Sequence, residues 1–223
     1  MSVIIPVLNE EGTIAATLAA LFSLPVKEVV VVDGGSSDHT RDIVAETQAK
    51  LVVSSKPRSR QMNLGARMAS GDILLFLHAD TRLPTSAVGD VGAALSDARF
   101  VGGRFDLKLD SEDWKYQMIG SLINLRSRWT RVATGDQAIF VRREVFEKLG
   151  GFPELPLMED IAFCRSLKRL GRVACLRSKV VTSSRRWERE GVWSTILRMW
   201  ILKILFLSGV PPARLKRFYG EAR

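Results

Sequence analysis

Three acidic side chains stand at positions where a sheet could present them to one ligand. Asp33 ends the apolar run Val29–Val32, Asp80 follows the apolar run Ile73–Leu77, and Asp160 opens a helical pattern after a loop rich in glycine and proline. In open parallel sheets, ligands bind beyond the carboxyl ends of the strands. Strand ends of this kind can place Asp33 and Asp80 at one edge of a sheet, where a carboxylate can contact a nucleobase or ribose or bind a metal ion.

His78 and Asp80 are two residues apart at the end of one predicted strand, so their side chains point the same way. A hard cation such as Mg²⁺ or Mn²⁺ prefers oxygen ligands and shares them with phosphates, which makes Asp80 the expected metal ligand. His78 is a second candidate ligand. Its alternatives are a supporting role beside the metal and a purely structural hydrogen bond.

Glu159 and Asp160 begin a helix, where the helix dipole alone favours acids. The functional alternative is a general base held at a fixed helix end. Two polar loops follow the first two predicted strands, one with Pro6, Asn9 and Glu10 and the other with Asp33 and Gly35. These loops can contact a nucleobase or ribose, and each taken alone is explained equally well as a turn or helix cap.

Three polar pairs are candidates to complete such a site. They are Arg60 with Asn63, Asp136 with Gln137, and Arg186 with Trp187. Arginine can clamp a diphosphate, and Arg58 is a further candidate for that contact. The Asp–Gln pair can orient hydroxyl groups, and an aromatic ring among cations suits phosphate or a sugar ring. The alternative for each pair is a turn or a solvated basic surface.

The periodicity of apolar residues predicts a single α/β domain followed by a helical tail. Strands are predicted over 2–7, 28–33, 51–54, 73–77, 100–109 and 137–142, and helices over 11–22, 38–47, 60–69, 87–95, 114–129, 144–149, 161–170 and 192–207. Continuous apolar strands that alternate with helices are typical of a parallel sheet covered on both faces. The predicted division is a domain over 1–190, with a nucleotide-binding half over 1–82 and an acceptor half over 83–190, and a tail over 191–223.

The composition is that of a globular protein with its basic charge at one end. Of 223 residues, 46% are hydrophobic and 26% charged, which disfavours disorder. The two cysteines form no disulfide framework and no signal peptide is recognisable, so a cytoplasmic setting is expected. Residues 172–223 hold 12 Lys/Arg against 3 Asp/Glu, whereas 1–171 hold 21 of each. A neutral main region argues against nucleic acid as the partner.

The run Val192–Leu207 is apolar on almost all sides, with Arg198 and Lys203 interrupting it. A membrane-spanning helix needs about 20 apolar residues with few charges, so this run is too short and too charged. A helix lying on an anionic membrane surface is one interpretation, because basic residues follow it. A helix packed on the domain or on a second subunit, as in a homodimer, is the other, and the residues favour neither.

Four motifs, taken together and in this order, resemble glycosyltransferase family 2. They are Pro6–Glu11, Val32–Asp38, His78–Asp80 and Glu159–Asp160. The resemblance covers residues 3 to about 190. It looks nearest to small bacterial members associated with radical-SAM and selenium-containing gene neighbourhoods, where the motifs Leu77–Thr81, Gly135–Ala138, Phe152–Pro153, Met158–Asp160 and Arg185–Glu188 are expected.

This resemblance implies a GT-A fold, with a mostly parallel mixed sheet flanked by helices and a C-terminal apolar-basic helix. It implies inverting transfer from a nucleoside diphosphate sugar to an acceptor hydroxyl. Asp33 would contact the nucleobase, Asp80 would bind Mn²⁺ or Mg²⁺ as the last acid of the DxD motif, and Asp160 would be the base beside Glu159. His78 replaces the first acid of that motif, and Ser183 stands where processive synthases have glutamine, which implies non-processive transfer.

The acceptor is not readable from the sequence, and a lipid-linked acceptor is one candidate because of the apolar-basic tail. The expected location is the cytoplasm. A more specific alternative is peripheral attachment to the cytoplasmic face of a membrane. Two other functions remain open. The first is nucleotidyl transfer on a related fold, and the second is a non-catalytic protein that binds a membrane surface.

Overall fold

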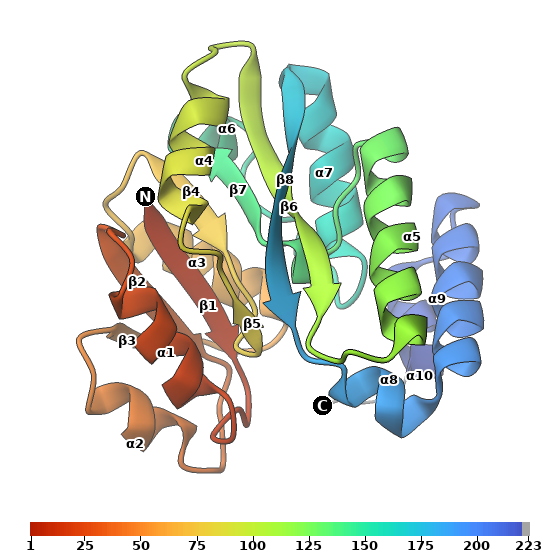
Figure 1. Ribbon diagram of the computed structural model, residues 1–223, viewed down its shortest axis with the longest axis horizontal. Helices are drawn as coiled ribbons and strands as arrows, with labels where there is room; N and C mark the ends of the chain where they lie inside the picture. Colours follow the sequence, from red (N-terminus) through yellow and green to blue (C-terminus); the bar gives the residue numbers. More distant parts are fainter. Residues whose placement is uncertain (220–223) are drawn as a thin grey trace.

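The computed structural model describes residues 1–219, except for the side chains at 186 and 217–219. Within this part, eight strands form one sheet in the order β3-β2-β1-β4-β7-β6-β8-β5, with helices on both faces (Figure 1). The strands are β1 (Ser2–Val7), β2 (Glu28–Asp33), β3 (Lys50–Val53), β4 (Ile73–Phe76), β5 (Thr81–Arg82), β6 (Phe100–Leu109), β7 (Ile139–Arg142) and β8 (Arg172–Thr182).

The helices are α1 (Ile14–Phe22), α2 (Thr40–Ala45), α3 (Arg58–Met68), α4 (Ala87–Leu95), α5 (Trp114–Thr130), α6 (Arg143–Lys148), α7 (Glu159–Leu170), α8 (Arg185–Glu190), α9 (Val192–Leu207) and α10 (Pro212–Tyr219), with a 3-10 turn over Gly135–Gln137. Strands β1 to β4 pair in parallel, β7 runs antiparallel between β4 and β6, and β8 runs parallel to β6. The predicted α/β fold with a mixed sheet flanked by helices is therefore confirmed.

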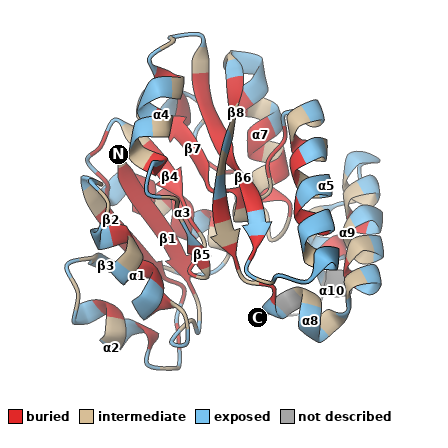
Figure 2. Cartoon of the chain, in the orientation of Figure 1, coloured by how far each residue is buried: buried red, intermediate tan, exposed pale blue. Residues whose placement is uncertain are grey.

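Alternate residues of the central strands supply two cores, one on each face of the sheet. Val3 and Ile5 of β1 belong to the cluster that α1, α2, α4 and α5 cover, whereas Ile4 belongs to the cluster under α3, α6 and α7. All six residues of β1 are buried, as the red strands of Figure 2 show. A sheet buried on both faces exposes functional side chains only at its edges and strand ends.

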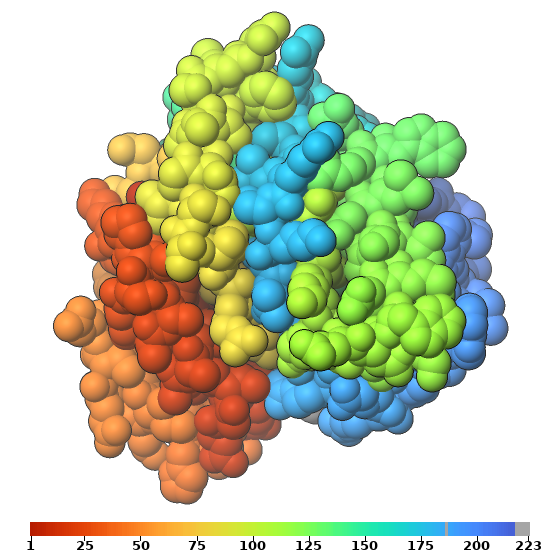
Figure 3. Space-filling view, in the orientation of Figure 1, coloured from red at the N-terminus to blue at the C-terminus, as the bar shows by residue number. Residues whose placement is uncertain are grey.

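The second half of the chain completes the same sheet and ends in a helical flank. On the front of the molecule, β8 reaches the surface between α4 and α5 (Figure 3). Helix α9 has the predicted bounds, and its residue Leu202 is buried against the domain, as is Leu215 of α10. Within the described part of the chain, no helix combines the length and apolar character needed to cross a membrane. The division at residue 190 stays a prediction.

Candidate active site

Hydrogen bonds join the loop after β1 to the loop after β2. The backbone N–H of Asn9 donates to the hydroxyl of Ser36 at 2.9 Å, and the N–H of Ser37 donates to Asn9 Oδ1 at 2.9 Å. The N–H of Glu10 donates to the hydroxyl of Thr40 at 2.8 Å. Asn9 has a φ of 55°, a left-handed conformation that asparagine adopts more readily than most residues. The two loops thus form one polar rim at the carboxyl ends of β1 and β2.

Asp33 shapes this rim from beneath. Its carboxylate is fully buried and accepts hydrogen bonds from the N–H groups of Gly35 at 2.9 Å and Ser36 at 3.0 Å. Gly35 has a φ of 93°, which glycine adopts without strain. A direct contact between Asp33 and a nucleobase would require this turn to open, and the role of Asp33 as a base contact stays a prediction.

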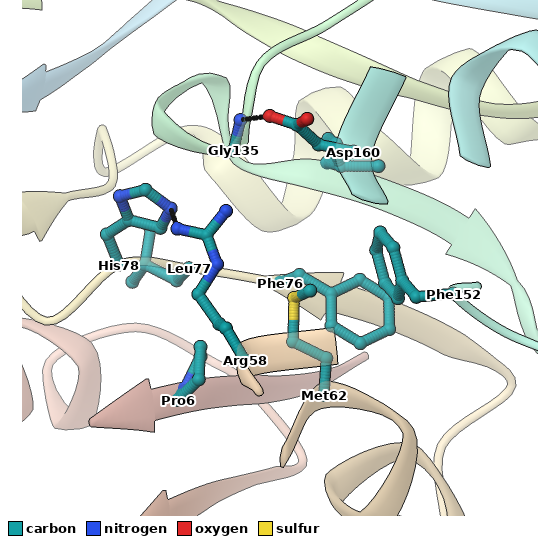
Figure 4. A pocket seen from close by; sticks show the side chains of 10 residues that line it. Pro6, Arg58, Met62, Phe76, Leu77, His78, Gly135, Phe152 and Asp160 are labelled. Carbon is teal, nitrogen blue, oxygen red and sulfur yellow. Dashed lines mark hydrogen bonds between the residues drawn. The ribbon is translucent and has the colours of Figure 1, made fainter. Parts of the chain in front are cut away.

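A small pocket lies where the ends of β1 and β4 meet the start of α7 (Figure 4). The predicted site residues Pro6, His78 and Asp160 line it together. Its apolar side is made by Met62, Phe76, Leu77, Ile139 and Phe152. Chain segments up to 154 residues apart, from Pro6 to Asp160, therefore meet at one edge of the sheet.

Arg58 stands between two of the predicted site residues. Its Nε and Nη2 lie 2.9 and 2.8 Å from Glu159 Oε1, and its Nη1 lies 2.7 Å from His78 Nε2. A guanidinium only donates hydrogen bonds, so Nε2 of His78 accepts and the ring proton is on Nδ1. A metal contact through Nε2 would require Arg58 to move. The metal-binding role of His78 stays a prediction.

Asp160 is half-buried at the pocket wall, and backbone N–H groups hold both of its carboxylate oxygens. Gly135 donates to Oδ2 at 2.8 Å and Ile161 donates to Oδ1 at 2.7 Å. Burial, followed by the negative charge of Glu159, raises the pKa of Asp160 from 3.8 to about 6, while Arg58 and these N–H groups act in the opposite direction. A carboxylate whose pKa approaches neutrality is matched to proton transfer.

Asp80 lies between β4 and β5, and its side chain is 27% exposed. Arg185 of α8 reaches toward it: its Nη2 is 3.8 Å from Asp80 Oδ2 and 3.5 Å from Glu10 Oε2. Helix α8 is thereby connected to the ends of β1 and β4. This contact places Glu10 and Asp80 on the same side of the rim.

Other predicted site residues hold loops in place. The amide of Asn63 exchanges two hydrogen bonds of 2.8 Å with the backbone of Phe152. The amide of Gln137 is buried and donates to the hydroxyl of Ser127 at 3.0 Å. The carboxylate of Asp136 accepts from the hydroxyl of Thr134 at 2.5 Å.

The remaining predicted contacts lie away from the pocket lining or outside the described side chains. Arg60 is exposed and forms an ion pair of 2.8 Å with Glu154, so Arg58 is the arginine at the pocket. Trp187 is half-buried against the core cluster on the α5 side of the sheet. The side chain of Arg186 lies outside the described part of the structure. Their contacts with a ligand stay predictions.

Two cations that the sequence did not identify as site residues interact electrostatically with Asp160. Burial lowers the pKa of Arg126 in α5 while the charges of Asp136 and Asp160 raise it, and its buried Nε and Nη2 have no hydrogen-bond partner. Burial, then the charge of Arg126, lowers the pKa of Lys203 in α9 to about 8, while Asp160 opposes the shift. The only signal in the sequence was that Lys203 interrupts an apolar run.

The sheet order and its rim of loops define the GT-A class of α/β folds, and solved structures of that class superpose on this chain. Glucosyl-3-phosphoglycerate synthase from Mycobacterium tuberculosis, in complex with Mn²⁺, UDP and glucosyl-3-phosphoglycerate, gives a TM-score of 0.67 at 22% identity, over 94% of this chain and 80% of that one. S. aureus TarS in complex with UDP gives 0.66 at 23% identity, over 82% and 60%.

The chain belongs to the family described as Glycosyl transferase family 2, whose model matches residues 2–150. It is 28% identical over 221 residues to the protein named probable glycosyltransferase YdaM from Bacillus subtilis, covering 85% of this chain and 50% of that protein. It is 28% identical over 174 residues to glycosyltransferase AglE from Haloferax volcanii, covering 69% and 56%. The chain thus spans about half the length of the curated relatives that it matches.

Proposed function

We propose that this protein transfers single sugars from a nucleoside diphosphate sugar to an acceptor hydroxyl, with inversion at the anomeric carbon. The observation that carries this proposal is Asp160: an acid with a pKa of about 6 that lines a pocket together with Pro6 and His78. Family membership supports the donor class. Glu159 is less suited as the base because Arg58 neutralises it.

The chemical step is one displacement. Asp160 accepts the proton of the acceptor hydroxyl while the oxygen forms a bond to the anomeric carbon. The bond between that carbon and the β-phosphate oxygen breaks, and its electron pair leaves with the nucleoside diphosphate. Attack from the face opposite the leaving group inverts the configuration. General-base assistance of this kind is worth about 10²–10⁴-fold in rate.

The fold family implies a divalent metal at the diphosphate, and Asp80 suits it. Mg²⁺ and Mn²⁺ are commonly held by one or two carboxylates together with substrate phosphates. The partly exposed carboxylate of Asp80 fits that requirement, although no cluster of three or more metal-binding side chains occurs among the described residues. When bound, the metal would neutralise charge on the leaving diphosphate. Mannosyltransferase PcManGT from Pyrobaculum calidifontis, solved with GDP-Man and Mn²⁺, supports this donor chemistry by analogy of fold.

The finer features of the proposal follow from the family resemblance and the C-terminal flank. We further propose that the protein groups with the small bacterial members associated with radical-SAM and selenium-containing gene neighbourhoods. Transfer is non-processive, because the glutamine of the processive motif is replaced by Ser183. The proposed location is the cytoplasmic face of a membrane, with a lipid-linked acceptor of a cell-envelope glycan.

The test begins with the donor. Thermal unfolding is measured with UDP-, GDP- and dTDP-sugars, each with and without Mn²⁺, since a ligand that binds only the folded protein raises the melting temperature by mass action. The matching donor is then incubated with candidate acceptors and the products are separated. Nucleoside diphosphate and a glycosylated acceptor of inverted configuration are the expected products.

Two results would overturn the proposal. Release of pyrophosphate instead of nucleoside diphosphate would indicate nucleotidyl transfer. If no donor raises the melting temperature and the protein nevertheless binds membranes, the chain is a non-catalytic surface-binding protein. A product with retained anomeric configuration would contradict the single-displacement mechanism, but it would still be consistent with sugar transfer.

A further inference from the structure

Helix α9 exposes a continuous row of large apolar side chains. The row consists of Trp193, Leu197, Trp200, Ile201, Ile204 and Leu207, and Trp193 is 75% exposed. Spacings of three and four residues place these side chains on one side of the helix. The other side packs inward, since Leu202 is buried. The exposed row is therefore not a requirement of the domain core.

Helix α5 exposes a second row. It consists of Trp114, Met118, Leu122, Leu125 and Trp129, and Trp129 is 89% exposed. The opposite side of α5 packs on β6 through Ile119 and Gly120. Together, five residues of α5 and six of α9 make up eleven of the fifteen large apolar side chains exposed in the described part of the chain. We name these eleven residues the α5–α9 face.

Helices α5 and α9 form one flank of the molecule (Figure 1). Ile123 of α5 and Ile196 of α9 pack against the same core cluster. The charge of Arg126 in α5 contributes to lowering the pKa of Lys203 in α9, which requires the two side chains to be near each other. Both rows thus belong to the same region of the surface.

Tryptophan is concentrated on this flank. The chain has five tryptophans, and four of them (Trp114, Trp129, Trp193 and Trp200) are exposed on α5 and α9. Tryptophan is enriched where proteins meet the interface between lipid headgroups and acyl chains, because its ring is apolar and its N–H is polar. The composition of the face therefore fits a lipid interface.

The charges near the α5–α9 face indicate which kind of partner surface it would bind. Residues 114–131 contain four Lys/Arg, residues 192–216 contain four more, and neither segment contains Asp or Glu. Among the described residues, the exposed cations Arg131, Arg214 and Lys216 form no ion pair with a carboxylate. In a twofold dimer this face would meet itself, cation against cation, which is unfavourable. An anionic bilayer is complementary to it in both charge and polarity.

We infer that the α5–α9 face docks on an anionic phospholipid bilayer. The apolar rows enter the interface in the plane of the membrane and the flanking cations contact the phosphates. Docking itself does not depend on the proposed sugar transfer.

The unmodified full-length protein provides the first test. It is mixed with vesicles of phosphatidylcholine alone or of phosphatidylcholine with phosphatidylglycerol, and bound protein is measured by co-sedimentation. We expect binding to the anionic vesicles that weakens as salt is added, since each surface cation contributes about fivefold at low salt. Brominated lipids should quench the fluorescence, because four of the five tryptophans lie on the face.

Variants then locate the contact. The pairs Trp193→Ser with Trp200→Ser, and Trp114→Ser with Trp129→Ser, should each reduce binding to anionic vesicles at least tenfold. The control is Val53→Ser, which removes an exposed apolar side chain from β3 at the opposite end of the sheet and should change nothing. Donor-induced shifts in melting temperature should survive in all variants, which separates a failure of docking from a failure of the proposed catalysis.

Three results would overturn the docking proposal. The first is absence of binding to anionic vesicles by the unmodified protein. The second is equal binding by the control and by both tryptophan pairs. The third is a dimer in solution that both pairs dissociate, measured by light scattering after gel filtration, because the face would then be covered by a second copy.

Discussion

The rim after β1 and β2 and the α5–α9 face differ in how they treat the side chains that do not enter the core. In the rim, polar groups of two loops bind one another, as Asn9 and Ser37 do, and the acid beneath them is fully buried. On the α5–α9 face, eleven large apolar side chains stay in water. The rim is completed within the chain. Helices α5 and α9 are stabilised by the side chains that pack on the domain. Their exposed apolar side chains contribute nothing to folding, and they would release hydrophobic free energy on binding to another surface.

The largest effect is expected at the site between these two regions. Asp160→Asn should lower the transfer rate by about 10²–10⁴-fold, because the proton of the acceptor then has no base to accept it. Donor affinity should stay nearly unchanged in a thermal-shift titration. The control Asp90→Asn alters a half-buried acid in α4 that accepts a hydrogen bond from Ser86 and should keep full activity. Near-normal transfer by Asp160→Asn would remove it as the base.

The same substitution, leucine to alanine, can be made in the core and on the α5–α9 face to compare how much each region contributes to stability. Leu18→Ala, in the core under α1, should lower the free energy of unfolding by about 2–5 kcal/mol. Leu125→Ala, on the exposed row of α5, should change it by no more than about 0.5 kcal/mol. Both are measured by urea denaturation of the protein without membranes. A cost for Leu125→Ala comparable to that of Leu18→Ala would mean that the face is buried in solution.

A smaller effect on stability and activity is expected at Gly135, whose backbone lies against His78 and Arg58. A methyl group added at Gly135 would lie 2.6 Å from His78 Nε2 and 2.9 Å from Arg58 Nη2. Gly135→Ala should therefore lower the free energy of unfolding by about 1–3 kcal/mol and reduce transfer, because Arg58 must shift. The matched control is Gly89→Ala at an exposed position of α4, where nothing lies within 4 Å of the added methyl group and helix propensity favours alanine by about 1 kcal/mol. Equal stability of the two variants would show that the contact is not tight.

The smallest effect is the pH dependence that Asp160 confers on stability. Its pKa of about 6 lies above the ordinary 3.8, so between these values the folded protein binds more protons than the unfolded one and ionisation destabilises the fold as the pH rises. The free energy of unfolding of Asp160→Asn minus that of the wild type should therefore increase by about 1–2 kcal/mol from pH 4 to pH 7. Urea titrations at four pH values measure it, and a flat difference would contradict the raised pKa.

Most helices and strands were predictable, and the errors have local causes. Strands Ser2–Val7 and Glu28–Asp33 and helix Val192–Leu207 have the predicted bounds. The first helix was predicted from Glu11 but begins at Ile14, because Glu11 is used to join the loops through the N–H of His39.

Two further errors lie in the second half of the chain. The strand predicted from Gln137 begins at Ile139, since Gln137 closes a turn onto the N–H of Thr134 at 3.3 Å. Strand β8 was not predicted, because it reaches the surface on one face and Arg177 and Lys179 interrupt its apolar pattern. Two features are therefore missed by a local apolar pattern. One is a polar side chain that bonds to a backbone group at the end of an element, and the other is a strand that is exposed on one face.

The sequence by itself determined the α/β class and the order of the polar loops along the chain, because apolar periodicity and local turn residues act over a few positions. The roles of the acids at 33, 80 and 160 stay predictions. The tertiary structure decided which arginine lines the pocket: Arg58 rather than Arg60 meets Glu159, 101 residues further along the chain. It also decided that Asp160 has a raised pKa and that the apolar rows of α5 and α9 face outward. Burial and charge depend on the whole surroundings of a residue, and these surroundings exist only once distant segments have packed together.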